Sequence, residues 1–215
     1  MVRRRYSLGW KFERSLRPAD VSVVAGVDEV GRGCWAGPVM AAAAILPDGF
    51  KHRHLNDSKL LIAEYREELS HFLCDHPDVQ WSIGVSSVGE IELHNILQAS
   101  LLAMRRAVAG LSIEPHLCFV DGNQKASLSC KEVTVIDGDA RCPSIAAASV
   151  IAKVARDRLM RELAVLYPGY GLENHKGYGT PEHARALTLH GPCAIHRRSF
   201  KPIRQHACAQ ADHNQ

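Results

Sequence analysis

Three apolar segments of the chain end in carboxylates, and each is followed at once by a glycine turn. The segments are VAGVDEVGRG (24–33), VDGN (120–123) and VIDGD (135–139), and their acids are Asp28, Glu29, Asp121, Asp137 and Asp139. A buried strand does not normally end by presenting negative charge, because an unpaired buried charge is costly. The acids are therefore expected to share one site that stabilises their negative charge. In open α/β sheets that site is the crevice beyond the carboxyl ends of the strands.

The composition is that of an ordinary soluble globular protein. The chain has 215 residues, of which 46% are hydrophobic and 23% charged, and this length suits one domain with an appendage. No apolar run approaches the ~18 residues that a membrane span needs. The first 15 residues contain arginines with no apolar stretch after them, so they do not form a secretory signal. These features predict a cytoplasmic location and no membrane partner.

Cysteine and histidine usage excludes two other classes of protein. The seven cysteines are scattered and form no C-x-x-C pair, which argues against a disulfide framework and fits a reducing compartment. The twelve histidines form no H-E-x-x-H motif and no zinc-finger spacing with cysteine. We therefore expect no zinc site.

The net charge of +3 hides an uneven distribution along the chain. Residues 1–17 and residues 175–204 each carry six Lys or Arg against one acid, whereas residues 18–174 carry 14 basic and 20 acidic side chains. An acidic middle with two basic ends suits a protein that holds a cation at its centre and touches a polyanion at its rim. An ordinary solvated surface is the alternative explanation.

Hydrophobic periodicity and turn residues predict an alternation of strands and helices. We expect strands at 21–30, 38–46, 80–88, 116–123 and 131–139, and helices from Asp57 or Ser58 to Cys74, at 89–111, at 143–171 and from Thr180 onward. The strand at 38–46 follows the first so closely that the two should pair. Strands clustered early, followed by strand–helix alternation, favour an α/β mixed sheet with helices on its faces.

A divalent cation would explain why acids gather at three strand ends. Carboxylates brought together without a counter-charge repel one another and raise one another's pKa values. Mg²⁺ and Mn²⁺ favour carboxylate and water oxygens. The alternative is that Asp-Gly is simply a common turn signal at 121–122 and 137–138.

The adjacent acids Asp28 and Glu29 pose a geometric problem for a shared metal site. Successive side chains of a regular strand point to opposite faces. Both can serve one site only if the chain leaves the strand at Glu29, or if Glu29 contributes through its carbonyl or through a water. Gly31 and Gly33 make such a departure easy.

Metal-bound carboxylates next to a basic rim point to phosphodiester chemistry. Two ions roughly 3.5–4 Å apart can hold the attacking and leaving oxygens of a phosphoryl displacement. A basic rim attracts a nucleic-acid backbone. The Gly31-Arg32-Gly33 turn lets main-chain N–H groups approach a sugar or phosphate, because no Cβ stands in the way at the glycines.

The chain resembles ribonuclease HII, the bacterial type 2 ribonuclease H family. The matching segments run from about residue 24 to residue 203; they are GVDEVGRGCWAGPV, LNDSKLL, VDGN, GDARCPSIAAASVIAKVARDRLM, YPGYGLENHKGYGTPEH and HRRSFKPI. The resemblance implies a ribonuclease H-like α/β fold, with a mixed five-stranded sheet flanked by helices and a small helical C-terminal appendage. The implied domain is 21–204, including a helical segment 180–204, between a basic extension 1–20 and a flexible tail 205–215.

The resemblance also implies an activity. It predicts an endonuclease that hydrolyses the RNA strand of RNA–DNA hybrids and cuts on the 5′ side of single ribonucleotides embedded in duplex DNA. The products would carry a 3′-hydroxyl and a 5′-phosphate. The reaction would use water activated by one or two Mg²⁺ or Mn²⁺ ions. Apart from the resemblance, the glycine-rich segment GYGLENHKGYGT lacks the Gly-Lys-Ser/Thr of a nucleotide-binding loop, so no ATP is expected, and nothing in the sequence suggests a large exposed apolar face, so we expect a monomer.

Catalytic and metal-binding roles carry over by resemblance onto four acids, which are Asp28, Glu29, Asp121 and Asp139. For the fourth acid, Asp139 is preferred to Asp137. Asp157 is a further alternative, but it lies within a predicted helix, where an ion pair with a neighbouring arginine is the simpler role.

Substrate contacts are implied for two further groups of residues. Gly31, Arg32 and Gly33 would contact the 2′-hydroxyl of the ribonucleotide through the backbone, and Tyr178 would pack against its sugar. A 2′-hydroxyl is the group that tells RNA from DNA at a given site. Lys59 and Lys153 could meet phosphates.

Two rival functions belong to other classes. One is a non-catalytic nucleic-acid-binding protein that kept the fold, and the other is a metal-dependent exonuclease on the same fold. Cleavage of all-DNA, hybrid and single-ribonucleotide duplexes would separate all three hypotheses.

Overall fold

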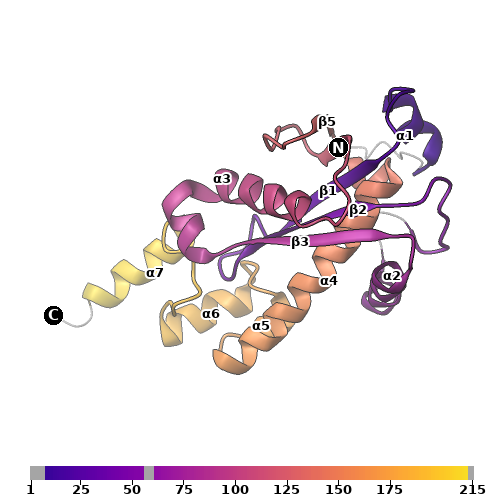
Figure 1. Cartoon of the computed structure of the whole chain (residues 1–215). Helices are drawn as coiled ribbons and strands as arrows, with labels where there is room; N and C mark the ends of the chain where they lie inside the picture. Colours follow the sequence, from indigo (N-terminus) through magenta and orange to yellow (C-terminus); the bar gives the residue numbers. More distant parts are fainter. Residues whose placement is uncertain (1–7, 56–60, 213–215) are drawn as a thin grey trace, which may run out of the picture. The chain divides into compact units, whose positions relative to one another are not determined.

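The computed structural model describes residues 8–55 and 61–212, and its centre is a mixed five-stranded sheet (Figure 1). The strand order is β3-β2-β1-β4-β5. The strands are β1 (Val24–Val30), β2 (Val39–Ile45), β3 (Gln80–Ser86), β4 (Leu117–Asp121) and β5 (Lys131–Val135). Strand β1 pairs antiparallel with β2 and parallel with β4, and β4 pairs parallel with β5. The predicted α/β class and the pairing of the first two strands are confirmed.

The described part of the chain also contains seven helices and one 3₁₀ turn. They are α1 (Trp10–Leu16), α2 (Ala63–Asp75), α3 (Val88–Ala109), η1 (Gly138–Ala140), α4 (Pro143–Leu166), α5 (Leu172–His175), α6 (Pro181–His190) and α7 (Lys201–Asp212). None of the helices in the described residues is both long enough and apolar enough to cross a membrane. Helix α7 runs into the segment 205–215, for which the sequence predicts a flexible tail.

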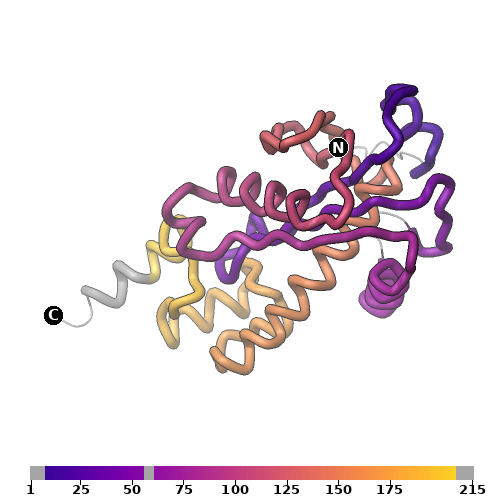
Figure 2. Tube along the Cα trace, in the orientation of Figure 1, coloured from indigo at the N-terminus to yellow at the C-terminus, as the bar shows by residue number. Residues whose placement is uncertain are grey.

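The chain forms two compact units, each built from three separate stretches. The colours of Figure 2 follow the residue numbers, so each stretch can be found along the trace. Unit 1 comprises Met1–Val30, Met40–Val85 and Leu101–Val154. Unit 2 comprises Gly31–Val39, Ser86–Ser100 and Ala155–Gln215. The boundary after Val30 separates the acids Asp28 and Glu29 from the glycine turn that follows them in sequence.

Small residues let the sheet and a helix of unit 1 approach closely. A Cβ at Gly26 in β1 would overlap the backbone of Ser144 and Ile145 at the start of α4. In the neighbouring strand β2, the run Ala41–Ala44 is completely buried. Because these side chains are short or missing, the start of α4 lies directly on the sheet.

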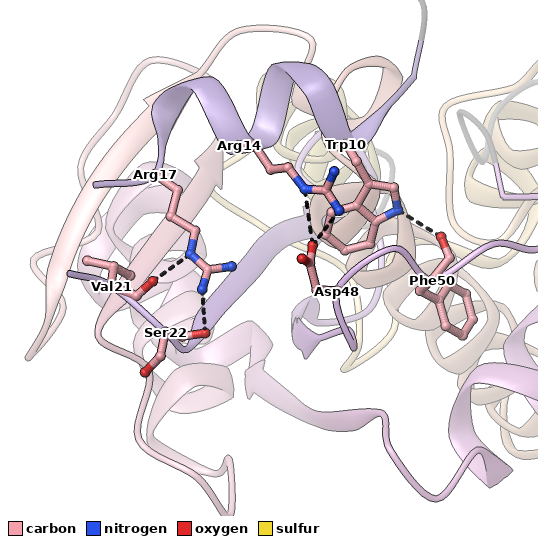
Figure 3. A network of polar contacts seen from close by, with 7 residues as sticks. All are labelled: Trp10, Arg14, Arg17, Val21, Ser22, Asp48 and Phe50. Atoms are coloured by element: carbon pink, nitrogen blue, oxygen red, sulfur yellow. Dashed lines mark hydrogen bonds and ion pairs between the residues drawn. The ribbon is translucent and has the colours of Figure 1, made fainter. Parts of the chain in front are cut away.

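The N-terminal helix α1 is an integral part of unit 1, although it precedes the first strand (Figure 3). The Trp10 indole N–H donates to the Phe50 carbonyl at 2.8 Å, and the Arg14 guanidinium pairs with Asp48 at 2.9 Å. Arg17 donates to the carbonyl of Ser22 at 3.0 Å, just before β1 begins. Two of the arginines near the N-terminus, Arg14 and Arg17, thus make contacts within unit 1.

A buried acid in α1 also fixes the start of α4. Glu13 is only 4% exposed, and its carboxylate accepts hydrogen bonds from the Ser144 N–H at 3.1 Å and the Ser144 hydroxyl at 3.0 Å. An acid at this position satisfies an N–H group that has no partner within the helix. Burial raises the pKa of Glu13.

The structure corrects two predicted helices. The helix predicted at 89–111 is broken at Asn95, whose φ of 67° is left-handed and whose side chain accepts from the N–H groups of Leu97 and Gln98 at 3.0 and 3.1 Å. Asn95 therefore ends one helical segment and caps the next. The helix predicted to begin at Asp57 or Ser58 has its first residue at Ala63, and both predicted caps lie outside the described residues.

Unit 2 has its own hydrophobic core. The buried residues of this core are Ala36, Met160, Tyr170, Leu172, Ala186, Leu187 and Ile203. They come from the segment after the glycine turn, from the second half of α4, from the loop between α4 and α5, and from α5, α6 and α7. This core supports the turn and the loop that carries Tyr178.

Candidate active site

The parallel pairing of β1 and β4 brings two of the predicted acids together at one edge of the sheet. Val27 of β1 lies opposite Val120 of β4, and the next residues along the two strands are Asp28 and Asp121. In parallel strands residues at equal steps from a matched pair stay side by side. The two carboxylates therefore come from neighbouring strands at their carboxyl ends, as the sequence predicts.

Asp28 is the buried acid at the carboxyl end of β1. It is 5% exposed, one of its carboxylate oxygens accepts the Glu29 N–H at 2.7 Å, and the Ser149 hydroxyl of α4 donates to it. Burial raises the pKa of Asp28 well above its usual value, and the charges of Asp121, Glu29 and Asp139 raise it further. The Ser149 hydrogen bond acts in the opposite direction. Three carboxylates thus repel a fourth that is buried.

The turn that follows β5 contacts the acids of β1 and β4 through Asp121. An oxygen of Asp121 accepts the Gly138 N–H at 2.7 Å, which ties the turn after β5 to the end of β4. Asp139, the next residue, lies in η1 and is 4% exposed. Asp137 has a left-handed φ of 53° and is exposed. The geometry therefore favours Asp139 over Asp137 as the fourth acid.

Strand β1 does not end at Glu29. Its ladder with β2 continues through Glu29 and Val30, which lie opposite Ala41 and Met40. The chain therefore does not leave the strand at Glu29, which removes one of the two ways in which Asp28 and Glu29 could share an ion. Glu29 is left to act through its carbonyl or through a water.

The donor set of this edge fits a hard divalent cation. The acids near this edge are carboxylates, which are the ligands that hard cations such as Mg²⁺ prefer. Zinc instead favours thiols and imidazoles. Within residues 8–55 and 61–212, no three acidic, histidine or cysteine side chains form a ready-made metal cluster. The structure supplies a mutually repelling pair, the buried Asp28 and the half-buried Asp121, with two acids near it. A cation would relieve that repulsion.

In unit 2, two buried arginines hold the segment that begins with the glycine turn. Arg156 is fully buried and donates from its three side-chain nitrogens to the carbonyls of Pro38, Lys176 and Ala36, at 3.0, 2.9 and 3.1 Å. Gly31 has a φ of 95°, and a Cβ there would overlap the Arg156 side chain. The first glycine of the turn is therefore required by the fold.

Arg197 holds the same segment from a second side. It is fully buried, and it donates to the Gly37 carbonyl at 2.9 Å and to the Arg32 carbonyl at 3.0 Å. Its own N–H donates to the Trp35 carbonyl at 2.8 Å. Burial lowers the pKa of Arg197 to about 10, which keeps the guanidinium charged at neutral pH.

Tyr178 lies on a loop held by buried histidines. The His183 Nδ1 lies 3.0 Å from the Tyr178 carbonyl, and the His183 Nε2 lies 3.0 Å from the His196 Nε2. The Cys193 N–H donates to the His196 Nδ1 at 3.0 Å. Because a carbonyl only accepts and an N–H only donates, these contacts assign one proton to each ring. Both histidines are neutral, and burial lowers the pKa of each to about 4.

The Tyr178 side chain itself is partly open to solvent. It is 41% exposed, and its hydroxyl hydrogen-bonds with the buried Cys34 thiol of the segment after the glycine turn. Burial raises the pKa of the phenol, and Cys34 raises it further. The ring is therefore both anchored and accessible.

Comparison with known proteins agrees with this geometry. The family model of ribonuclease HII matches residues 25–203. This chain belongs to the ribonuclease HII family. Ribonuclease HII of Parvibaculum lavamentivorans is 52% identical over 193 residues, which cover 87% of this chain and 69% of the relative. That of Bordetella pertussis is 52% identical over 183 residues, covering 85% and 90%.

The fold of this ribonuclease HII is confirmed by a solved structure. The crystal structure of ribonuclease H2 from Pyrococcus horikoshii OT3 has a TM-score of 0.73 and 27% identity, and the match covers 87% of this chain and 98% of that one. The predicted ribonuclease H-like sheet is therefore correct. As a family member the protein is an endoribonuclease, a hydrolase that acts on RNA–DNA hybrids.

The predicted site residues of this ribonuclease HII fall into two groups. Unit 1 contains the four acids and Lys153, which lies on α4 one turn after Ser149. Unit 2 contains the glycine turn, Tyr178 and Asp157. Lys59 lies outside the described residues.

Sequence reasoning missed the side chains that support these groups. Ser149 binds Asp28, and its position is hidden in the alanine-rich start of α4. Arg156 and Arg197 stand in the matching segments 138–160 and 196–203, but a run of basic residues does not reveal which member is buried. Arg156, the residue before Asp157, donates from its side-chain nitrogens to backbone carbonyls.

Proposed function

We propose that this ribonuclease HII cuts on the 5′ side of single ribonucleotides embedded in duplex DNA, in addition to the RNA strand of hybrids. The products carry a 3′-hydroxyl and a 5′-phosphate. The observation that supports the proposal best is the parallel register of β1 and β4, which places Asp28 beside Asp121 with Asp139 close enough to raise the pKa of Asp28.

For the chemistry we propose that Asp28, Glu29, Asp121 and Asp139 hold one or two Mg²⁺ or Mn²⁺ ions. Such ions supply a water of lowered pKa and stabilise the charge that develops on the leaving oxygen. The chain's own residues set the positions of the acids. Ser149 and the Glu29 N–H orient Asp28, and the Gly138 N–H orients Asp121.

For substrate recognition we propose roles in unit 2. The backbone of Gly31, Arg32 and Gly33 contacts the 2′-hydroxyl, and the accessible ring of Tyr178 packs against the sugar. A flat, anchored aromatic ring gives contact area with little loss of conformational freedom. Lys153 and Lys59 are proposed phosphate contacts, where a lysine acts as a point charge.

A panel of three duplexes tests the proposal. The duplexes have one sequence and are all-DNA, an RNA–DNA hybrid, and DNA with a single ribonucleotide, each incubated with Mg²⁺ or Mn²⁺. We expect one cut 5′ of the single ribonucleotide, several cuts in the hybrid and none in the all-DNA duplex. Stepwise shortening from an end would instead indicate an exonuclease, and an intact single-ribonucleotide duplex would contradict the proposed specificity.

A further inference from the structure

The two internal peptide groups of the glycine turn have inward-facing carbonyls. The Gly31 carbonyl accepts the Cys34 N–H at 3.4 Å, and the Arg32 carbonyl accepts from Arg197 at 3.0 Å. The described chain contains no cis peptide bonds. In a trans peptide the C=O and the following N–H point in opposite directions. Holding the Arg32 carbonyl against Arg197 therefore turns the Gly33 N–H away from that guanidinium.

Gly33 is a glycine that its own fold does not require. It is exposed, its φ lies outside the left-handed region, and a Cβ there would meet no described atom within 4 Å. Its N–H makes no hydrogen bond to the described residues. By contrast, Gly31 has both a left-handed φ and a neighbour in the way. The missing side chain at residue 33 is therefore explained by an approach from outside the protein.

Burying Arg197 has a free-energy cost that stability alone does not explain. It forms no ion pair with a carboxylate of the described residues, and its Nη2 has no hydrogen-bond partner among them. A buried unpaired donor costs about 1–3 kcal/mol. A packed apolar side chain would fill such a position at less cost.

We propose that Arg197 is a positioning residue, which aims the Gly33 N–H at the 2′-hydroxyl of the substrate by holding the Arg32 carbonyl. The inference rests on the proposed function, in which the turn reads that hydroxyl. The planar guanidinium spans two carbonyls at once, from Nε to Gly37 and from Nη1 to Arg32. A lysine has its donors on one atom at the end of a flexible stem, so it cannot reproduce this arrangement.

The variant Arg197→Lys tests the proposal because it keeps a basic side chain but removes the guanidinium that spans the two carbonyls. Arg198→Lys is the matched control, since Arg198 is the next residue and is exposed. Binding is measured in EDTA by fluorescence anisotropy, with one DNA duplex and the same duplex carrying a single ribonucleotide. We expect the preference of the wild type for the ribonucleotide to fall about 5- to 10-fold in Arg197→Lys, the loss of roughly one hydrogen bond. Affinity for all-DNA should not change, and Arg198→Lys should keep the wild-type preference.

The outcomes separate this inference from the function on which it rests. A wild type without preference for the ribonucleotide would refute the reading of the 2′-hydroxyl. A wild type with the preference and a folded Arg197→Lys that retains it would refute the positioning role alone. Hydrogen exchange gives a second readout, because the Cys34 amide should exchange faster in Arg197→Lys; equal exchange would also count against the role.

A measurement on the wild type covers the case in which Arg197→Lys does not fold. The amide resonance of Gly33 should shift when the ribonucleotide duplex is added and stay in place with the all-DNA duplex. Equal responses to the two duplexes would overturn the proposal, because the Gly33 N–H would then not distinguish them.

Discussion

The acidic sheet edge of unit 1 and the glycine turn of unit 2 solve opposite electrostatic problems. At the sheet edge, Asp28 is buried beside other acids, and their charges raise its pKa. At the turn, Arg156 and Arg197 are buried as cations, and five backbone carbonyls accept hydrogen bonds from their guanidinium groups. Carbonyl dipoles thus stabilise the buried positive charge. The comparison indicates that the fold itself stabilises the buried charges beside the turn, whereas we propose that the acid edge is completed by a bound cation.

The largest expected effect concerns the acid edge. Asp121→Asn keeps the side-chain shape but removes one charge and one strong metal ligand. Metal-assisted catalysis is worth several kcal/mol, so we expect cleavage to fall about 100-fold or more. In the wild type, Mn²⁺ should raise the melting temperature, because the ion binds only the folded state, and Asp121→Asn should lose that rise. A variant with wild-type cleavage and an unchanged Mn²⁺ response would place the site elsewhere.

Acidification should damage the histidine-held loop of unit 2. The pKa of His183 and of His196 is about 4 in the folded protein, against about 6.5 when unfolded. The unfolded state therefore binds more protons between these values, and stability is lost as the pH falls from 6.5 toward 4. Between pH 7 and pH 5 we expect a loss of about 2 kcal/mol for each histidine.

Urea unfolding at the two pH values measures this loss. The groups that face the pair are His175, Glu182, His206 and Arg198. His196→Gln should shrink the difference between pH 7 and pH 5, whereas the exposed His94→Gln should leave it as in the wild type. A difference that His196→Gln does not change would show that the neutral pair is not what acid disrupts.

The two glycines of the turn should respond differently to the same substitution. Gly31→Ala places a Cβ on Arg156 in a left-handed backbone, and we expect it to cost about 2–3 kcal/mol of unfolding free energy. Gly33→Ala meets open space, so stability should stay within about 0.5 kcal/mol of the wild type while cleavage at a single ribonucleotide falls. Denaturant unfolding and a cleavage assay check both variants, and equal losses of stability would contradict the assignment.

The smallest expected effect is a gain in stability. Asp28→Asn removes a buried charge that burial and three acids disfavour, so the metal-free variant should be more stable than the wild type by about 1 kcal/mol. For a chain of this length that is a rise of about 2–4 °C in melting temperature. Scanning calorimetry in EDTA measures it, and a lower melting temperature would mean that the acids are not under mutual strain.

The sequence predicts the acid edge well because one local signal repeats there. An apolar run, an acid and a glycine occur together at three strand ends, and parallel pairing brings such ends to one edge. The preference for Asp139 over Asp137 came from the resemblance and not from this signal, which both acids share. The sequence did not predict whether β1 continues beyond Glu29. That continuation depends on the hydrogen-bonded ladder with β2 and not on the identity of residues 29 and 30.

The supports of the turn were not predictable in the same way. Arg156 and Arg197 lie more than 100 residues from the carbonyls of Ala36 and Gly37 that they hold. Nothing in a basic run distinguishes a buried arginine from an exposed one such as Arg198. The kink at Asn95 is a further case, since asparagine within a helical pattern is common and only the backbone shows that it acts as a cap.

A manganese-soaked crystal tests the central claim most directly. We predict an anomalous density peak at the acid edge, in contact with both the Asp28 and the Asp121 carboxylates. No peak at that position, with the two carboxylates turned away from each other, would contradict the account.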